Sequence, residues 1–119
     1  MLNAIISTIS VIIQINYSIE YYQPIDSSEE IKLMLAIKNN DFDSIENILS
    51  NNLVSLNDYY EGKTFVIWAA IYDKPEVINI LVNFGADVSI KCEFGYTIEE
   101  HCIANKSTKA LAEIIVLTS

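Results

Sequence analysis

The stretch that decides the fold runs from residue 62 to residue 91 and reads GKTFVIWAAIYDKPEVINILVNFGADVSIK. It begins at a turn glycine, continues as an apolar run behind Thr64, and is interrupted at Asp73-Lys74-Pro75. A second apolar stretch with helical spacing follows and ends at Phe84-Gly85-Ala86-Asp87. Because proline is tolerated at the first position of a helix and glycine is typical just past the last one, this pattern predicts two short helices joined as a hairpin.

The hairpin pattern recurs at a fixed spacing, as the pairs Gly62 with Gly95 and Thr64 with Thr97 show. A period of about 33 residues is typical of stacked repeats, whereas a coiled coil would repeat every heptad. Four series of small or branched residues keep the same spacing: Ala36, Ala69 and Cys102; Ile45, Ile78 and Leu111; Ile48, Leu81 and Ile114; Leu49, Val82 and Ile115.

On these residues, positions 28–119 resemble ankyrin repeats, whose pattern is G-x-T-P-L-H-x-A-A, then E-V-V-x-L-L and G-A-D-V-N. The middle repeat matches it at Gly62, Thr64, Ala69, Ala70, Glu76, Val77, Ile78, Leu81, Gly85, Ala86, Asp87 and Val88. It departs at Phe65, Val66 and Ile67 (Pro, Leu and His in the family), at Asp73 (Gly) and at Ser89 (Asn). The resemblance implies an all-α ankyrin-repeat solenoid of about three stacked helix-turn-helix repeats, at residues 26–58, 59–91 and 92–119.

Several helix boundaries can be predicted from local signals. We expect helices at residues 29–38, 98–104 and 108–117, a second helix of the first repeat starting at Asp43-Ser44, and Pro75 at a helix start. Ser27 and Glu30 have the spacing of a capping box. Thr64 is expected to cap the next helix. The family's histidine, which hydrogen-bonds near that threonine, is replaced here by Ile67.

Residues 1–25 form an apolar N-terminal segment, and residues 1–19 carry no charged side chain. Three interpretations remain open: a capping element that covers the first repeat, an export leader, and a membrane anchor. The leader lacks a basic start and a small-x-small cleavage site, and the anchor is diluted by polar residues. Alternating and helical apolar spacings are both present, so periodicity does not decide among the three.

Composition excludes several classes of function. The chain has 119 residues, seven lysines and no arginine against sixteen acids, and a net charge of -9. Such a surface repels phosphate backbones, so we expect no nucleic-acid partner. Two cysteines, Cys92 and Cys102, provide neither a disulfide framework nor a four-ligand zinc site, and indicate reduced thiols in a cytoplasmic protein. No residue pattern calls for a cofactor or a metal.

One cluster, Glu99-Glu100-His101-Cys102, contains residue types that could act in catalysis. Adjacent residues of a helix point about 100° apart, so His101 cannot activate Cys102 from within the same helix. His101 lies one repeat period after Trp68, which indicates a structural role. We therefore expect no enzyme activity.

The remaining signal is a set of residues where ankyrin proteins leave side chains free for partners, at the turn tips and the outer ends of the first helices. The resemblance places there Tyr60, Glu61, Lys63, Ile71, Tyr72, Glu93, Phe94, Tyr96 and Asn105, with Lys38 and Asn39 in the first repeat. Exposed aromatic residues of this kind serve as interface anchors. We expect a protein-interaction module whose partner has a basic surface or an apolar pocket. The alternative is a membrane-attached or exported ankyrin protein, such as a host-interaction effector, that uses residues 1–19 as anchor or leader.

Overall fold

The structure is a computed structural model that describes residues 28–119. In this part of the chain the secondary structure is helical, apart from one isolated bridge between Tyr60 and Lys63. The helices are α2 (Glu29–Lys38), α3 (Phe42–Ser50), α4 (Phe65–Ile71), α5 (Pro75–Asn83), α6 (Ile98–Ala104) and α7 (Thr108–Thr118).

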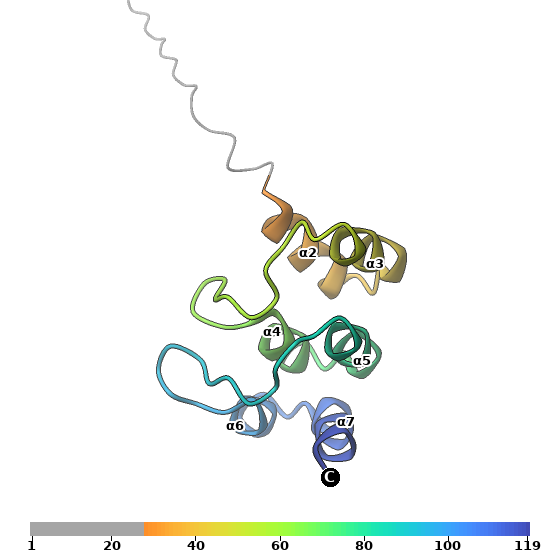
Figure 1. Cartoon of the computed structure of the whole chain (residues 1–119). Coiled ribbons are helices and arrows are strands. Elements are labelled where there is room, and N and C mark those ends of the chain that lie inside the picture. The colour runs from red at the N-terminus through yellow and green to blue at the C-terminus, as the bar shows by residue number, and fades with distance from the viewer. Residues whose placement is uncertain (1–27) are drawn as a thin grey trace, which may run out of the picture. The chain divides into compact units, whose positions relative to one another are not determined.

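The helices are arranged as consecutive antiparallel pairs. Figure 1 shows α2, α4 and α6 following one another in one layer and α3, α5 and α7 in a second layer beside it. Helix α4 packs on α5 and on α6, and α7 packs on α5 and on α6. The loops after α3 and after α5 project to the side away from α3, α5 and α7 (Figure 1). The prediction of an all-α stack of three helical hairpins is confirmed.

The turns inside the hairpins repeat with the period of the sequence. Asn40, Asp73 and Lys106, which occupy equivalent positions of the three repeats, all adopt the left-handed conformation, with φ of 55°, 57° and 57°. In each turn the next amide N–H donates to a carbonyl at the end of the preceding helix, as in Lys74 to Ala69 (3.0 Å) and Ser107 to Cys102 (2.8 Å). This is the Schellman arrangement, which satisfies the carbonyls at the end of a helix. The three turns therefore have one geometry despite three different side chains.

The apolar series of the sequence form the core. Ala36, Ala69 and Cys102 are buried, as are Ile48, Leu81 and Ile114. The series diverge in the third repeat, where one side of the helices lacks a neighbour within residues 28–119. There Cys102 and Ile114 stay buried, but Leu111 is only half-buried and Ile115 is 56% exposed. The neighbouring Ile103 and Val116 are 66% and 68% exposed.

The predicted helix boundaries agree closely with the structure. Helices α2 and α6 have the expected ends, and Pro75 is the first residue of α5. Helix α3 starts at Phe42, one position before the expected start, because Asp41 is its cap and accepts a hydrogen bond from the Ser44 amide at 3.2 Å. Ser27 lies outside the described residues, and the neighbouring Ser28 accepts from the Ile31 amide.

The prediction that Thr64 caps a helix is right in position but wrong in the expected hydrogen bond. Thr64 occupies the cap position of α4, but its buried hydroxyl has no hydrogen-bond partner among the described residues. Thr97, one repeat later, forms a complete capping box with Glu100. Ile67, a buried apolar residue, stands where the third repeat has Glu100, so the reciprocal side-chain acceptor of a capping box is missing in α4. The start of α4 is therefore held by the burial of Phe65, Val66 and Ile67 without a side-chain cap hydrogen bond.

The three interpretations of residues 1–19 concern a segment outside the described residues. None of the helices within residues 28–119 combines the length and the hydropathy that crossing a bilayer requires.

Candidate protein-binding surface

Two hairpin loops carry most of the predicted partner-binding residues. In the first loop (residues 59–63), Tyr60 and Lys63 exchange backbone hydrogen bonds of 2.8 and 3.3 Å. Glu61 and Gly62 between them both have positive φ, as a two-residue type I′ turn requires. In the second loop (residues 92–96), the amide of Cys92 donates to Tyr96 and the amide of Gly95 donates to Cys92. This second pattern is a three-residue turn with glycine at the left-handed position.

The two loops are fixed to each other by hydrogen bonds between repeats. The Glu93 amide donates to the Gly62 carbonyl at 2.9 Å, and the Tyr59 hydroxyl donates to the Lys91 carbonyl. Nearer the helices, Asn57 bridges to the next repeat: its side-chain nitrogen donates to the Gly85 carbonyl at 3.1 Å, and its side-chain oxygen accepts from the Asp87 amide at 2.8 Å. Side chains on both loops are therefore presented from one pre-organised support.

A ladder of cations and aromatic rings connects the first loop to the end of α2. The Lys63 ammonium lies 4.7 Å from the Trp68 ring centroid, and Trp68 stacks on Tyr72 with centroids 6.2 Å apart. The Lys38 ammonium lies 5.4 Å from the Tyr72 centroid. The Trp68 indole donates to the Tyr60 carbonyl at 2.8 Å. Trp68 is not among the residues predicted to contact a partner, although its i, i+4 spacing from Tyr72 places both on one helix face.

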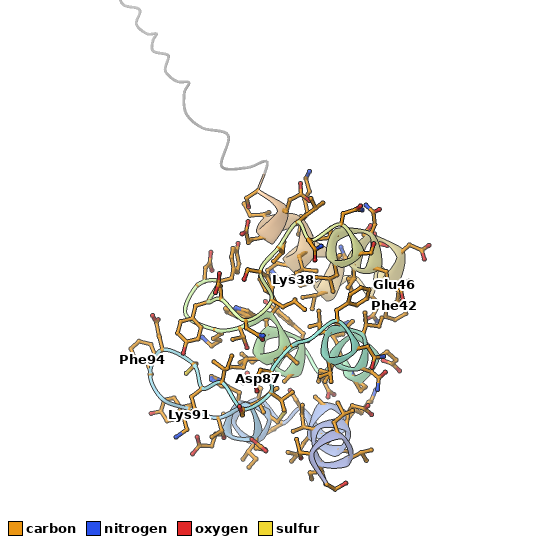
Figure 2. The ribbon with its side chains drawn as sticks, viewed as in Figure 1. Lys38, Phe42, Glu46, Asp87, Lys91 and Phe94 are labelled. Atoms are coloured by element: carbon orange, nitrogen blue, oxygen red, sulfur yellow. The ribbon has the colours of Figure 1, made fainter. Side chains whose placement is uncertain are left out.

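The structure separates the predicted residues into two groups. Half-buried, and packed against the core or the ladder, are Tyr60, Lys63, Ile71 and Tyr72. Exposed are Lys38, Asn39, Glu61, Glu93, Phe94, Tyr96 and Asn105. Among the aromatic residues, Phe94 is 78% exposed and Tyr96 is 55% exposed, whereas Tyr60 stacks on Phe65 with centroids 5.5 Å apart. Figure 2 shows Phe94 at the outer end of the second loop.

His101 lies beside the second loop on the same helical layer. Its ring meets Tyr96 edge-on, with centroids 6.2 Å apart, and its Nε2 is buried without a partner among the described residues. Burial lowers the pKa of His101, the positive charge of Lys63 lowers it further, and Glu100 opposes the shift. The imidazole is therefore neutral at pH 7. Leu35, Trp68 and His101 are separated by one repeat period each and occupy equivalent positions in the three first helices.

Comparison with known proteins places this geometry in a family. A family model described as ankyrin repeats (3 copies) matches residues 33–116. The chain belongs to the ankyrin-repeat family.

Two further similarities accompany the match to ankyrin repeats. An ankyrin repeat protein of Rickettsia bellii is 28% identical over 94 residues, which are 76% of this chain and 14% of that protein. A solved chain from the complex of a predatory endopeptidase of Bdellovibrio bacteriovorus with an immunity protein superposes with a TM-score of 0.63 at 22% identity. That match covers 71% of this chain and 44% of the solved one. The chain thus spans less than half the length of either protein.

Acidification is expected to destabilise this ankyrin-repeat domain through His101. Because the folded-state pKa is lowered, the unfolded chain binds the proton more readily. The stability gained from the neutral ring is complete above about pH 6.5 and is lost as the pH falls through the lowered pKa. The urea concentration at the unfolding midpoint should fall between about pH 7 and pH 5 in the wild type, and we expect it to fall less in His101→Gln. His101 is the single histidine of the chain, so equal losses in both proteins would contradict this assignment.

The cysteines of the ankyrin-repeat domain have the properties of core residues. Cys92 and Cys102 are both buried and free. Burial raises the pKa of Cys102 to about 11, and the charges of Asp73 and Glu99 raise it further. A thiol with a raised pKa is a poor nucleophile at neutral pH. Among residues 28–119, no group of three His, Cys, Asp or Glu side chains is placed to hold a metal ion. Ankyrin-repeat domains are typically non-catalytic protein-binding modules.

Proposed function

We propose that this ankyrin-repeat domain binds a partner protein through the two hairpin loops and the exposed ends of its first helices, without catalysis. The observation that carries the proposal is the display of Phe94 and Tyr96 on a loop that is hydrogen-bonded to its neighbour. Large exposed aromatic side chains close together are unusual on a surface that contacts only water. The similar chain from an endopeptidase–immunity protein complex supports a role in protein complexes for this kind of stack.

Pre-organisation of the loops favours tight binding. The bond between Glu93 and Gly62 and the two bonds of Asn57 fix the loops before a partner arrives. Ordering a free loop on binding would reduce the affinity, and fixing it beforehand removes that cost. Aromatic side chains have few rotatable bonds and lose little conformational entropy on binding, so Phe94 and Tyr96 are efficient contacts.

Charge and apolar surface together define the proposed partner. Glu61 and Glu93 are exposed on the loops that carry the aromatic side chains, and the chain as a whole has a net charge of -9. Charge of this sign accelerates the approach of a basic protein and slows that of an acidic one. The proposed partner has a pocket for an aromatic side chain within a basic surface. The two free cysteines support a reducing compartment such as the cytoplasm as the place of action.

The proposal is tested by loss of partner binding when the exposed aromatic residues are removed. Partners captured from source cells by the full chain would be identified, purified and titrated against the double variant Phe94→Ala/Tyr96→Ala. If both residues are anchors, the affinity should fall by at least about 30-fold. Tyr60 and Tyr72 are left intact because their rings pack on Phe65 and Trp68, so truncation would lower stability as well.

A matched control is available at the other exposed apolar site. Ile115 and Val116 of α7 are 56% and 68% exposed, and Ile115→Ala/Val116→Ala removes apolar surface outside the loops and the first helices. This control should bind like the wild type. Equal binding by the Phe94→Ala/Tyr96→Ala variant, with circular dichroism unchanged, would show that the loops are not the binding surface.

A further inference from the structure

A groove crosses the second helices of the repeats, on the side away from the two loops. It has a volume of about 610 Å³ and is lined by Phe42 and Glu46 of α3, Pro75, Glu76, Asn79 and Ile80 of α5, and Glu113 of α7. Figure 2 shows Phe42 and Glu46 together at α3, on the opposite side of the stack from Phe94. The proposed loop surface and this groove therefore share no residue.

The groove combines an apolar floor with an acidic rim. Phe42 is 39% exposed, and Pro75 and Ile80 are half-buried, so a hydrophobic strip remains open to solvent. Three of the seven lining residues are glutamates, and none is basic. Lys74 and Lys109 are close in sequence to the lining residues but do not line the groove.

A place in the first turn of a helix accounts for only one of the three carboxylates. Glu76 is in the first turn of α5, where a negative charge is stabilised by the helix dipole. Glu46 is in the middle of α3, and its carboxylate forms no hydrogen bond or ion pair with another described residue. Glu113 is in the middle of α7 and accepts one hydrogen bond, from Asn79 at 3.0 Å. Glutamates from three successive repeats thus lie beside one apolar strip, and no basic side chain lines the groove with them.

We propose that this groove is a second docking surface and that it takes a basic amphipathic segment of a partner protein. The apolar side of the segment covers Phe42 and Ile80, and lysine or arginine side chains pair with Glu46 and Glu113. Charge complementarity selects this occupant, since an acidic or uncharged segment would bury the same apolar strip but leave the carboxylates partly desolvated and unpaired. The groove is open along the second helices, which suits a segment of chain lying across several repeats.

The test uses two synthetic helical peptides with the same leucine pattern, one with lysine and one with glutamate at the polar positions. The full-length protein is titrated with each peptide by fluorescence anisotropy, and the site is mapped by amide chemical shifts. We expect the lysine peptide to bind and to shift the amides of Phe42, Glu46, Asn79 and Glu113. Binding should weaken as salt is raised, because Glu46 and Glu76 are exposed and Glu113 is only half-buried.

Paired variants separate a specific groove from general attraction to an acidic protein. Glu46→Gln/Glu113→Gln removes two rim charges and keeps a side-chain oxygen at position 113 that can accept the Asn79 hydrogen bond, so the affinity should fall about tenfold or more. Asp58→Asn/Glu99→Gln changes the net charge by the same amount at exposed positions outside the groove, and should reduce the affinity less than about twofold. Phe42→Ala should abolish binding, and circular dichroism should show that the helices are retained. The loop variant Phe94→Ala/Tyr96→Ala should bind the lysine peptide normally, whatever the outcome for the loops.

Three results would overturn the proposal. Equal weakening by both charge-removing pairs would show non-specific attraction. Equal binding of the glutamate peptide would show that charge does not select the occupant. A dimer detected by light scattering and dissociated by Phe42→Ala would show that a second copy of the chain covers the groove instead.

Discussion

Replacing Leu81 by alanine is expected to lower the free energy of unfolding by about 2–5 kcal/mol, the usual cost of a cavity at a buried leucine. Leu81 is fully buried in α5, which packs on α4 and on α7. The repeat that contains it has a neighbour on each side, so the surrounding helices cannot collapse into the space. Native stability of small domains is about 5–15 kcal/mol, so this single change removes a large part of it.

The matched control for Leu81→Ala is Ile115→Ala, in a neighbouring position of the third repeat. Ile115 is 56% exposed, although Leu49 in the same register of the first repeat is buried. We expect Ile115→Ala to change stability by less than about 0.5 kcal/mol, as exposed substitutions usually do. Urea unfolding followed by circular dichroism measures both. Similar losses for the two variants would mean that the repeats do not differ in packing as the structure indicates.

Opposite changes in stability are expected when Asp73 and Lys106 are each replaced by glycine. Both residues have φ of 57° in equivalent turns, where glycine is free of the steric cost that a side chain incurs. Lys106→Gly should therefore raise the free energy of unfolding by up to about 1 kcal/mol. Asp73 has a second role, because its carboxylate accepts a hydrogen bond from the Ala110 amide at 2.8 Å across the boundary between repeats.

Asp73→Gly loses that charged acceptor and leaves a half-buried amide unsatisfied, which costs about 1–3 kcal/mol. Aspartate tolerates this conformation better than lysine, so glycine relieves less backbone strain at position 73 than at position 106. That relief does not offset the lost hydrogen bond. The expected net result is destabilisation by about 1–2 kcal/mol. The pair is compared by thermal unfolding at one pH. A stabilised Asp73→Gly variant would show that the bond to Ala110 contributes nothing.

The fold could be predicted from sequence because the repeat is visible without any alignment. The series through Ala69, Ile78 and Leu81 keeps its register on both sides of the middle repeat, and each member recurs at the same place in every hairpin. Helix ends were predictable where a local signal fixes them, as Pro75 does at the start of α5. The start of α3 was misplaced by one position because Asp41 and Asp43 are both plausible caps and only the folded backbone selects Asp41.

The candidate surface was less predictable because exposure depends on contacts between repeats. Tyr60 and Phe94 both belong to turn loops, yet Tyr60 lies against Phe65 whereas Phe94 meets solvent. The role of Asn57 as a bridge between loops depends on Gly85 and Asp87, which belong to the next repeat. The groove beside Phe42 is made by three helices of different repeats, so no single stretch of sequence indicates it.

The uncovered side of α6 and α7 has a consequence for how the stack opens. In a one-dimensional array, a unit with a single neighbour is held by one interface, and its fraying costs less free energy than opening a unit held on both sides. Within residues 28–119 the first and the third hairpins each have a single neighbour, and the entry loop of the third carries Phe94 and Tyr96. A partner seated on this loop would bind the closed form alone, so its binding energy would also suppress fraying at this end of the array.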